Sequence, residues 1–271
     1  MTSREDEALA EAAVAALTGQ LALAPKPGLP DPRDLGARDH CSLRWSAKAL
    51  VPGLVAMAAA ARRTGEPTPT LRAELGAIGR CTEHSVGLAG GGHRGALWTL
   101  GLLVAAAALD PRAAAPDIAA TAKRIAAHPD KRAPRRPSRG SSVSAKYGAA
   151  GARGEARAGF PHVRRALDAL TASRSRGAPE TEARLDALLT VMSTLQDTEL
   201  LYTAGPLGLR HVQAGAREVL EAGGTSTHAG AAALTSLDTD LHTRAWSPRG
   251  SAGLLAGALF LDSLPVAAGV A

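Results

Sequence analysis

The fourteen residues from Gly148 to Pro161 combine residue types that suit anion binding with a single carboxylate. Four of them are glycines, two are the arginines Arg153 and Arg157, and Glu155 stands between the arginines. Glycine lets a ligand approach the main chain closely, and a guanidinium presents a planar fork that suits phosphate. We interpret the segment as a phosphate-binding element with a carboxylate beside it. A glycine-broken loop with solvated charges is the alternative.

A second glycine cluster, Gly87–Gly95, stands directly before an apolar helix expected at 96–109. Its spacing satisfies GxGxxG, but no strand precedes it, so we reject a dinucleotide-binding fold. A glycine turn that opens a helix can still hold phosphate on its free N–H groups, with His93 and Arg94 beside it. For His93, a helix-capping or packed histidine is the alternative.

A proline-rich stretch at 23–36 cannot be regular helix or central strand, because it holds four prolines. As a rigid loop it can present four charged side chains in fixed positions: Lys26, Asp31, Arg33 and Asp34. An ordinary proline-rich connector with surface charges explains it equally well.

Three further segments carry polar groups at helix ends or in loops. Asp197 lies near the end of a helix expected at 180–201, where a buried carboxylate is costly unless it has a partner or a task. The segment Trp246–Gly253 leads into a final apolar helix at 254–261. Residues 131–139 pack five positive charges among prolines, so they form an extended loop: a solvated surface segment, or a lid or steering patch for a polyanion.

The composition predicts how these segments are held. Hydrophobic residues make up 45% of the 271, yet aromatics only 3%, so the core must be close-packed alanine, leucine and valine. Alanine is the best helix former, which predicts an all-α fold. We expect one helical-bundle domain over residues 1–271, with glycine- and proline-rich loops between helices forming the active site. The remaining helices are expected at 4–18, 42–63 with a kink at Pro52, 70–83, 116–127, 162–172, 208–222 and 229–244.

Net charge and residue usage indicate which classes of ligand the protein binds. A formal charge of +6 and a pI near 9.9 favour anions. The few aromatic residues argue against a nucleic-acid module that stacks bases, so phosphorylated small molecules are favoured. Two cysteines without a CxxC pair give neither a disulfide framework nor a metal site. No secretory signal or membrane-length apolar run is present, so we expect a cytoplasmic protein that binds no membrane.

Taken together and in order, these segments resemble the triphosphoribosyl-dephospho-coenzyme A synthase family, and its malonate decarboxylase branch most. The resemblance runs over nearly the whole chain. Its motifs are PKPGLPDPRD at 25–34, HRGALW at 93–98, GARGEARAGFP at 151–161, the pair Asp197-Thr198, and SPRGSAGLLA at 247–256. Any one of them alone would be weak.

The resemblance implies an all-α enzyme that transfers the 5-triphosphoribosyl group of ATP to the 2′-hydroxyl of 3′-dephospho-CoA and releases adenine. The product is the prosthetic-group precursor of malonate decarboxylase, which implies an indirect link to the acyl carrier subunit of that enzyme and to its transferase. Mg²⁺ is expected to accompany ATP.

The resemblance also suggests roles for individual residues. Glu155 or Asp197 would act as general base, and His93 would assist the departure of adenine. Asp31 and Asp34 would hold magnesium. Substrate binding is assigned to a larger set: Lys26, Arg33, Arg94, Arg153, Gly154, Ser247 and Ser251.

The chain departs from the family pattern at Tyr202 and Thr203, where the family has a His-Arg pair, and at Gly253, where it has an aspartate. These positions carry the alternative interpretation, in which an impaired relative binds ATP or dephospho-CoA without turnover. A basic helical nucleic-acid binder is a third hypothesis, which rests on charge alone.

Overall fold

The computed structural model describes residues 2–33, 37–88, 92–133 and 138–265. Within these ranges the chain forms helices and connecting turns and no strand, which confirms the all-α prediction. The helices are α1 (Arg4–Leu21), α2 (Ala37–Lys48), α3 (Val51–Thr64), α4 (Pro69–Leu88), α5 (Arg94–Leu109), α6 (Ala115–Ala127), α7 (Arg139–Tyr147), α8 (Gly151–Arg157), α9 (Pro161–Ser175), α10 (Glu180–Met192), α11 (Thr198–Thr203), α12 (Gly205–Glu221), α13 (His228–Thr243) and α14 (Arg249–Ser263).

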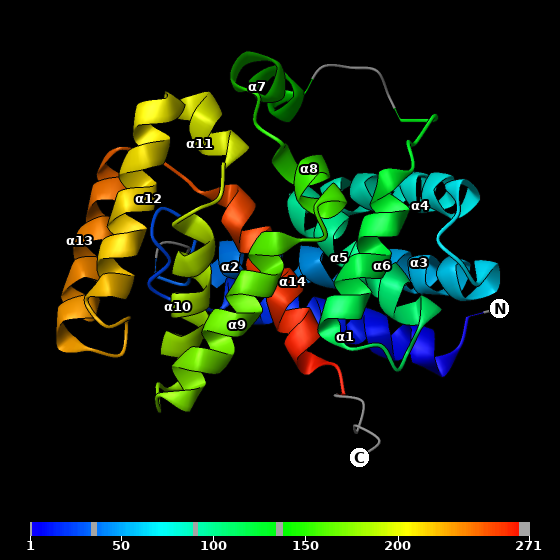
Figure 1. Cartoon of the computed structure of the whole chain (residues 1–271), viewed down its shortest axis with the longest axis horizontal. Helices are drawn as coiled ribbons and strands as arrows, with labels where there is room; N and C mark the ends of the chain where they lie inside the picture. The colour runs from blue at the N-terminus through cyan, green and yellow to red at the C-terminus, as the bar shows by residue number, and fades with distance from the viewer. Residues whose placement is uncertain (1, 34–36, 89–91, 134–137, 266–271) are drawn as a thin grey trace.

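Helix α14 runs through the middle of the molecule, between two groups of helices (Figure 1). It packs against α1 and α5 on one side and against α9 and α10 on the other. Helices α3, α4 and α6 extend the first group, and α12 and α13 extend the second. One continuous cluster of buried apolar side chains runs through both groups.

Helices α5 and α14 are apolar on nearly every face, as helices in the centre of a bundle must be. Their small side chains let the axes approach closely: a Cβ on Gly257 would lie 2.8 Å from Thr99 Cγ2. Close packing of alanine and glycine therefore forms this core, which has few large aromatic side chains.

Two helices expected to be continuous are each interrupted. The helix predicted at 42–63 with a kink is two helices, since α2 ends at Lys48 and α3 starts at Val51 with Pro52 in its first turn. Proline suits that position because a first-turn residue needs no N–H partner. The helix predicted at 180–201 ends at Met192, and α11 starts afresh after Asp197.

The segments expected to be loops contain two helices that the sequence did not indicate. Ser138 caps α7 in a reciprocal capping box with Ser141, so the basic stretch ends in a helix. The glycine-rich GARGEAR segment is itself helical and forms α8. Gly148 and Gly159, both with positive φ, lie outside its two ends and allow the sharp turns there.

None of the described helices is both long enough and apolar enough to cross a bilayer.

Candidate active site

The start of α14 is joined to the start of α11 by one buried carboxylate. Asp197 Oδ1 accepts the N–H of Glu199 at 2.8 Å and of Leu200 at 3.3 Å, and Oδ2 accepts the N–H of Gly250 at 2.8 Å. Burial raises the pKa of Asp197, although backbone N–H groups of both helices oppose the shift. Asp197 therefore caps two helices at once, and both of its oxygens are occupied.

The start of α14 also lies directly against the start of α5. A Cβ on Gly253 would lie 3.1 Å from Ala96 N and 3.2 Å from the carbonyl carbon of Gly95. These are main-chain atoms, so they cannot move aside as a flexible side chain can. A side chain at position 253 therefore requires α5 and α14 to move apart by a few tenths of an ångström.

Helix α8 contacts both α5 and α11. Trp98 Nε1 on α5 donates to Ala152 O at 3.0 Å, and a Cβ on Gly151 would lie 3.5 Å from Thr198 Cγ2. The first turns of α5, α8, α11 and α14 thus contact one another in sequence, and we call them the helix-start ring. Because helix N-termini carry partial positive charge, the long helices α5 and α14 make this region favourable for an anion.

Two serine hydroxyls at the start of α14 are buried without a hydrogen-bond partner among the described residues: Ser247 Oγ and Ser251 Oγ. The side chain of Ser251 is completely buried. An unpaired buried hydroxyl is costly, and a bound ligand is one way to satisfy it. Both serines were predicted to bind substrate, and the structure places them at the helix-start ring.

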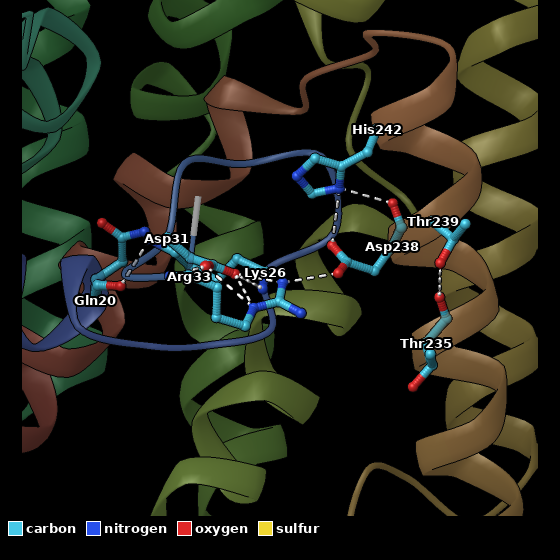
Figure 2. Close-up of polar contacts among 8 residues, drawn as sticks. All are labelled: Gln20, Lys26, Asp31, Arg33, Thr235, Asp238, Thr239 and His242. Atoms are coloured by element: carbon cyan, nitrogen blue, oxygen red, sulfur yellow. Dashed lines mark hydrogen bonds and ion pairs between the residues drawn. The ribbon is translucent and has the colours of Figure 1, made fainter. Parts of the chain in front are cut away.

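The proline-rich loop packs on the turn that leads into α14. A Cβ on Gly28 would lie 2.2 Å from Trp246 O, and Gly28 has φ +64°. Asp31 organises the loop, because its carboxylate accepts the N–H groups of Lys26 and Arg33 and pairs with the Arg33 guanidinium at 2.6 Å. Arg33 also bonds Asp238 on α13 at 2.7 Å, as Figure 2 shows.

This arrangement changes the interpretation of three predicted residues. Lys26 is buried and its Nζ donates to Gln20 O at 3.2 Å, so its side chain points into the protein (Figure 2). Asp31 has both oxygens on N–H donors, and Arg33 and the backbone lower its pKa against the effect of burial. Asp34 lies outside the described residues.

The magnesium site expected from Asp31 and Asp34 stays a prediction, because Asp34 lies outside the described residues. The Asp31 carboxylate is already neutralised by a guanidinium and has no free oxygen for a hard cation. Within the described ranges, no three His, Cys, Asp or Glu side chains lie close enough together to hold a metal ion. We therefore derive no step through a metal.

His93 lies at the entrance of α5 and is buried. Its Nε2 is 2.9 Å from Ser46 Oγ and 3.2 Å from Leu43 O, and burial lowers its pKa, so the ring is neutral at pH 7. It does not cap the helix with its side chain, so of the alternatives to a catalytic role the packed histidine is the one observed. A cavity of about 130 Å³ lies beside it, lined in part by Arg94, which pairs with Glu83 at 2.7 Å.

Glu155 is buried on α8 and pairs with His162 at the start of α9. One carboxylate oxygen accepts the His162 backbone N–H at 2.8 Å, and the other lies 2.7 Å from His162 Nδ1. Phe160, between them, adopts a left-handed backbone with φ +53°, a strained conformation of the kind that collects at functional sites. Arg153 is exposed on the same helix, and Gly154 lies in the interior of the helix.

Sequence reasoning missed several polar partners, above all His162, Ser46 and Asp238. His162 stands one residue beyond the GARGEARAGFP segment, and that position was the only signal for it. Ser46 and Asp238 come from helices that the sequence could not place near His93 and Arg33.

Comparison with known proteins bears on the same segments. Residues 6–270 match the CitG family, described as ATP:dephospho-CoA triphosphoribosyl transferase. A protein of Stutzerimonas stutzeri is 47% identical over 270 residues, which cover 97% of this chain and 93% of that one. A protein of Pseudomonas aeruginosa is 48% identical, covering 97% and 92%. Both carry the name "Probable 2-(5''-triphosphoribosyl)-3'-dephosphocoenzyme-A synthase". No solved structure matches the chain.

Proposed function

Since the chain belongs to the CitG family of ATP:dephospho-CoA triphosphoribosyl transferases, we propose that it makes the prosthetic-group precursor of malonate decarboxylase. It moves the 5-triphosphoribosyl group of ATP to the 2′-hydroxyl of 3′-dephospho-CoA and releases adenine. The observation that carries the proposal is the helix-start ring, because four separate sequence motifs contribute its members.

The reaction exchanges one bond at the ribose anomeric carbon for another. The bond from C1′ to N9 of adenine breaks, and a bond from C1′ to the acceptor oxygen forms. The acceptor hydroxyl loses a proton and adenine gains one, so the balance needs no further reactant. Positive charge develops on the ribose during the exchange, and a site for it must combine anion binding with nearby carboxylates.

The Glu155–His162 pair is the group best arranged to take the hydroxyl proton. With Nδ1–H donated to Glu155, the His162 ring presents the lone pair of Nε2, and the carboxylate fixes this tautomer. Glu155 then acts through His162 and stabilises the imidazolium that forms, as a carboxylate does beside a catalytic histidine. This refines the role predicted for Glu155 as the direct base.

The other predicted residues bind and position. Ser247, which is partly exposed, hydrogen-bonds a phosphate oxygen at the start of α14, and Asp197 holds α11 and α14 together. His93 is neutral and, with Nε2–H donated to Leu43 O, it offers Nδ1 as an acceptor. It therefore accepts a hydrogen bond from the adenine amino group rather than protonating the base.

The test is release of free adenine from purified protein with ATP, magnesium and 3′-dephospho-CoA, with each component omitted in turn. Adenine that appears only with both substrates, beside an adduct of matching mass, supports the proposal. A folded protein that binds ATP and releases no adenine contradicts it.

The malonate decarboxylase branch needs its own test. The product is offered, with the matching transferase, to the apo acyl carrier subunits of malonate decarboxylase and of citrate lyase. Mass spectrometry measures how fast each carrier is modified, and we expect the malonate decarboxylase carrier to be modified faster than the citrate lyase carrier. Faster loading of the citrate lyase carrier contradicts the assignment.

The impaired-relative alternative is not favoured. Identities of 46% to 48% to several synthases span nearly the whole chain. Two of the three departures also make local contacts: Gly253 fits the close approach of α14 to α5, and the Arg139 guanidinium lies 5.1 Å from the centre of the Tyr202 ring.

A further inference from the structure

A group of arginines lies beside the helix-start ring, on the side of α4 and α6. Arg72 and Arg80 come from α4, and Arg153 and Arg157 come from α8; we call these four the arginine cluster. Their only carboxylate partner within the described ranges is Asp130, at the end of the turn after α6. The cluster therefore carries a net excess of three positive charges around one negative charge.

The side chain of Asp130 is buried, and both of its oxygens already have partners. Its Oδ2 bonds Arg80 at 2.6 Å and lies 3.8 Å from Arg72, and its Oδ1 accepts the backbone N–H of Arg132 at 3.0 Å. Burial would raise its pKa, but Arg80 and the backbone of Arg132 lower it, so it stays ionised. Asp130 neutralises one arginine and has little capacity left for the others.

Arg72 is the central member of the cluster and is more than nine-tenths buried. Its guanidinium lies 5.0 Å above the centre of the Trp98 ring, and its Nε finds no acceptor in the described part of the chain. Burial lowers its pKa, and the charges of Arg153, Arg80 and Arg157 lower it further. A buried guanidinium with an unused donor among like charges is unfavourable unless an anion joins it.

The position of the cluster connects it to the ring. Trp98, which lies under Arg72, donates to Ala152 O in the first turn of α8. Arg153 follows Ala152 directly, so the cluster continues the anion-favouring region of the ring toward the surface. Arg153 and Arg157 are four residues apart on α8 and lie on the same exposed face.

We propose that the arginine cluster binds the triphosphate chain of the nucleotide donor. The proposal rests on the transferase function, because that reaction keeps all three phosphates on the transferred ribose. A triphosphate carries more negative charge than the pyrophosphate diester of the acceptor, so the three excess positive charges attract it more strongly. Guanidinium forks suit it because they bond phosphate oxygens in pairs.

The first test uses inorganic tripolyphosphate as a probe, with binding measured by calorimetry in the absence of nucleotide. The variant is Arg153→Gln/Arg157→Gln, which changes two exposed residues and keeps the buried Arg72. The control, Arg112→Gln/Arg210→Gln, removes the same charge from exposed positions outside the cluster. Affinity should fall roughly tenfold or more in the first variant and stay unchanged in the control. Equal affinities in all three proteins overturn the proposal.

The second test assigns the ligand by kinetics. In the Arg153→Gln/Arg157→Gln variant the KM for ATP should rise, and the KM for 3′-dephospho-CoA should not. A rise confined to the acceptor would place its pyrophosphate in the cluster and overturn the assignment to the donor. If the wild type binds tripolyphosphate at the cluster but releases no adenine, the transferase proposal fails and the cluster stands.

Discussion

Replacing Asp197 by asparagine will weaken the junction between α11 and α14. The amide oxygen can still accept the N–H groups of Glu199 and Leu200, but the amide nitrogen then faces the N–H of Gly250, where Oδ2 now lies 2.8 Å away. Two donors opposed at that distance cannot both be satisfied.

The magnitude follows from the groups left unpaired. A buried N–H without an acceptor costs about 1–3 kcal/mol. The substitution also removes a buried charge whose pKa burial has raised, and this recovers part of the loss. We therefore expect the free energy of unfolding to fall by roughly 1–2 kcal/mol.

The assay is denaturant unfolding of the wild type, Asp197→Asn and Asp168→Asn, whose carboxylate is exposed on α9. The control should match the wild type. An Asp197→Asn protein as stable as the control refutes the account of Asp197 as a two-helix cap. Adenine release tests whether Asp197 is also the general base. Loss of a general base lowers turnover by about 10²–10⁴-fold, so a drop of that size in a folded Asp197→Asn protein would make Asp197 the base.

Three further predictions follow from single contacts. Gly28→Ala should destabilise the protein by more than Gly65→Ala, because both have positive φ but only the Gly28 Cβ meets a backbone oxygen, at 2.2 Å; equal losses in unfolding experiments would contradict this. The hydrogen bond with Arg174 is the main cause that lowers the pKa of Glu180 to about 2. The Glu180–Arg174 pair therefore stabilises the folded protein above pH 4.5, the ordinary pKa of a glutamate, and this contribution is lost as the pH falls from 4.5 toward 2. Glu180→Gln should therefore flatten the acid limb of stability against pH, and an unchanged limb would show that the pair contributes nothing. Glu155→Gln and His162→Gln should each lower kcat about 10²-fold or more with little change in the KM for ATP, and their double variant should be no worse than either alone; additive losses would mean that they do not act as a pair.

Most of the helical framework could be predicted from residue types, because apolar spacing and alanine content act locally. The helices around Leu71, Ile118 and Leu237 follow such spacing. Helix breaks were harder to predict: Asp197 can start a new helix because its side chain accepts the N–H groups of Glu199 and Leu200, and apolar periodicity does not report that choice.

Helix α8 shows why glycine-rich segments mislead. Glycine is a poor helix former, and Gly151 and Gly154 together favour a loop in isolation. Tertiary contacts outweigh that preference, since Trp98 bonds the carbonyl of Ala152 and Glu155 bonds His162. The sequence marked this segment as chemically important and gave the wrong backbone for it.

The sequence could predict which segments contribute to the candidate site, but it could not predict where their side chains lie relative to one another. Arg72 fits the spacing of an ordinary helix residue, and only Trp98 and Asp130, from other elements, make it a buried charge. Lys26 shows the converse: its type suits phosphate, but in the structure its side chain is buried and donates to Gln20 O. Long-range contacts decide the case of Arg72, whereas a contact only six residues away along the chain decides that of Lys26.

The packing of α14 against α5 in the helix-start ring explains the departure from the family pattern at Gly253. An aspartate there would bring its Cβ within 3.1 Å of Ala96 N, so the main chains of α5 and α14 would have to move apart by a few tenths of an ångström. It would also add a carboxylate to a region whose helix N-termini and arginines favour phosphate. Glycine keeps α5 and α14 in contact and leaves Asp197 as the carboxylate that joins the helix starts. The departure at Gly253 therefore has a local structural explanation, the close contact of α5 with α14.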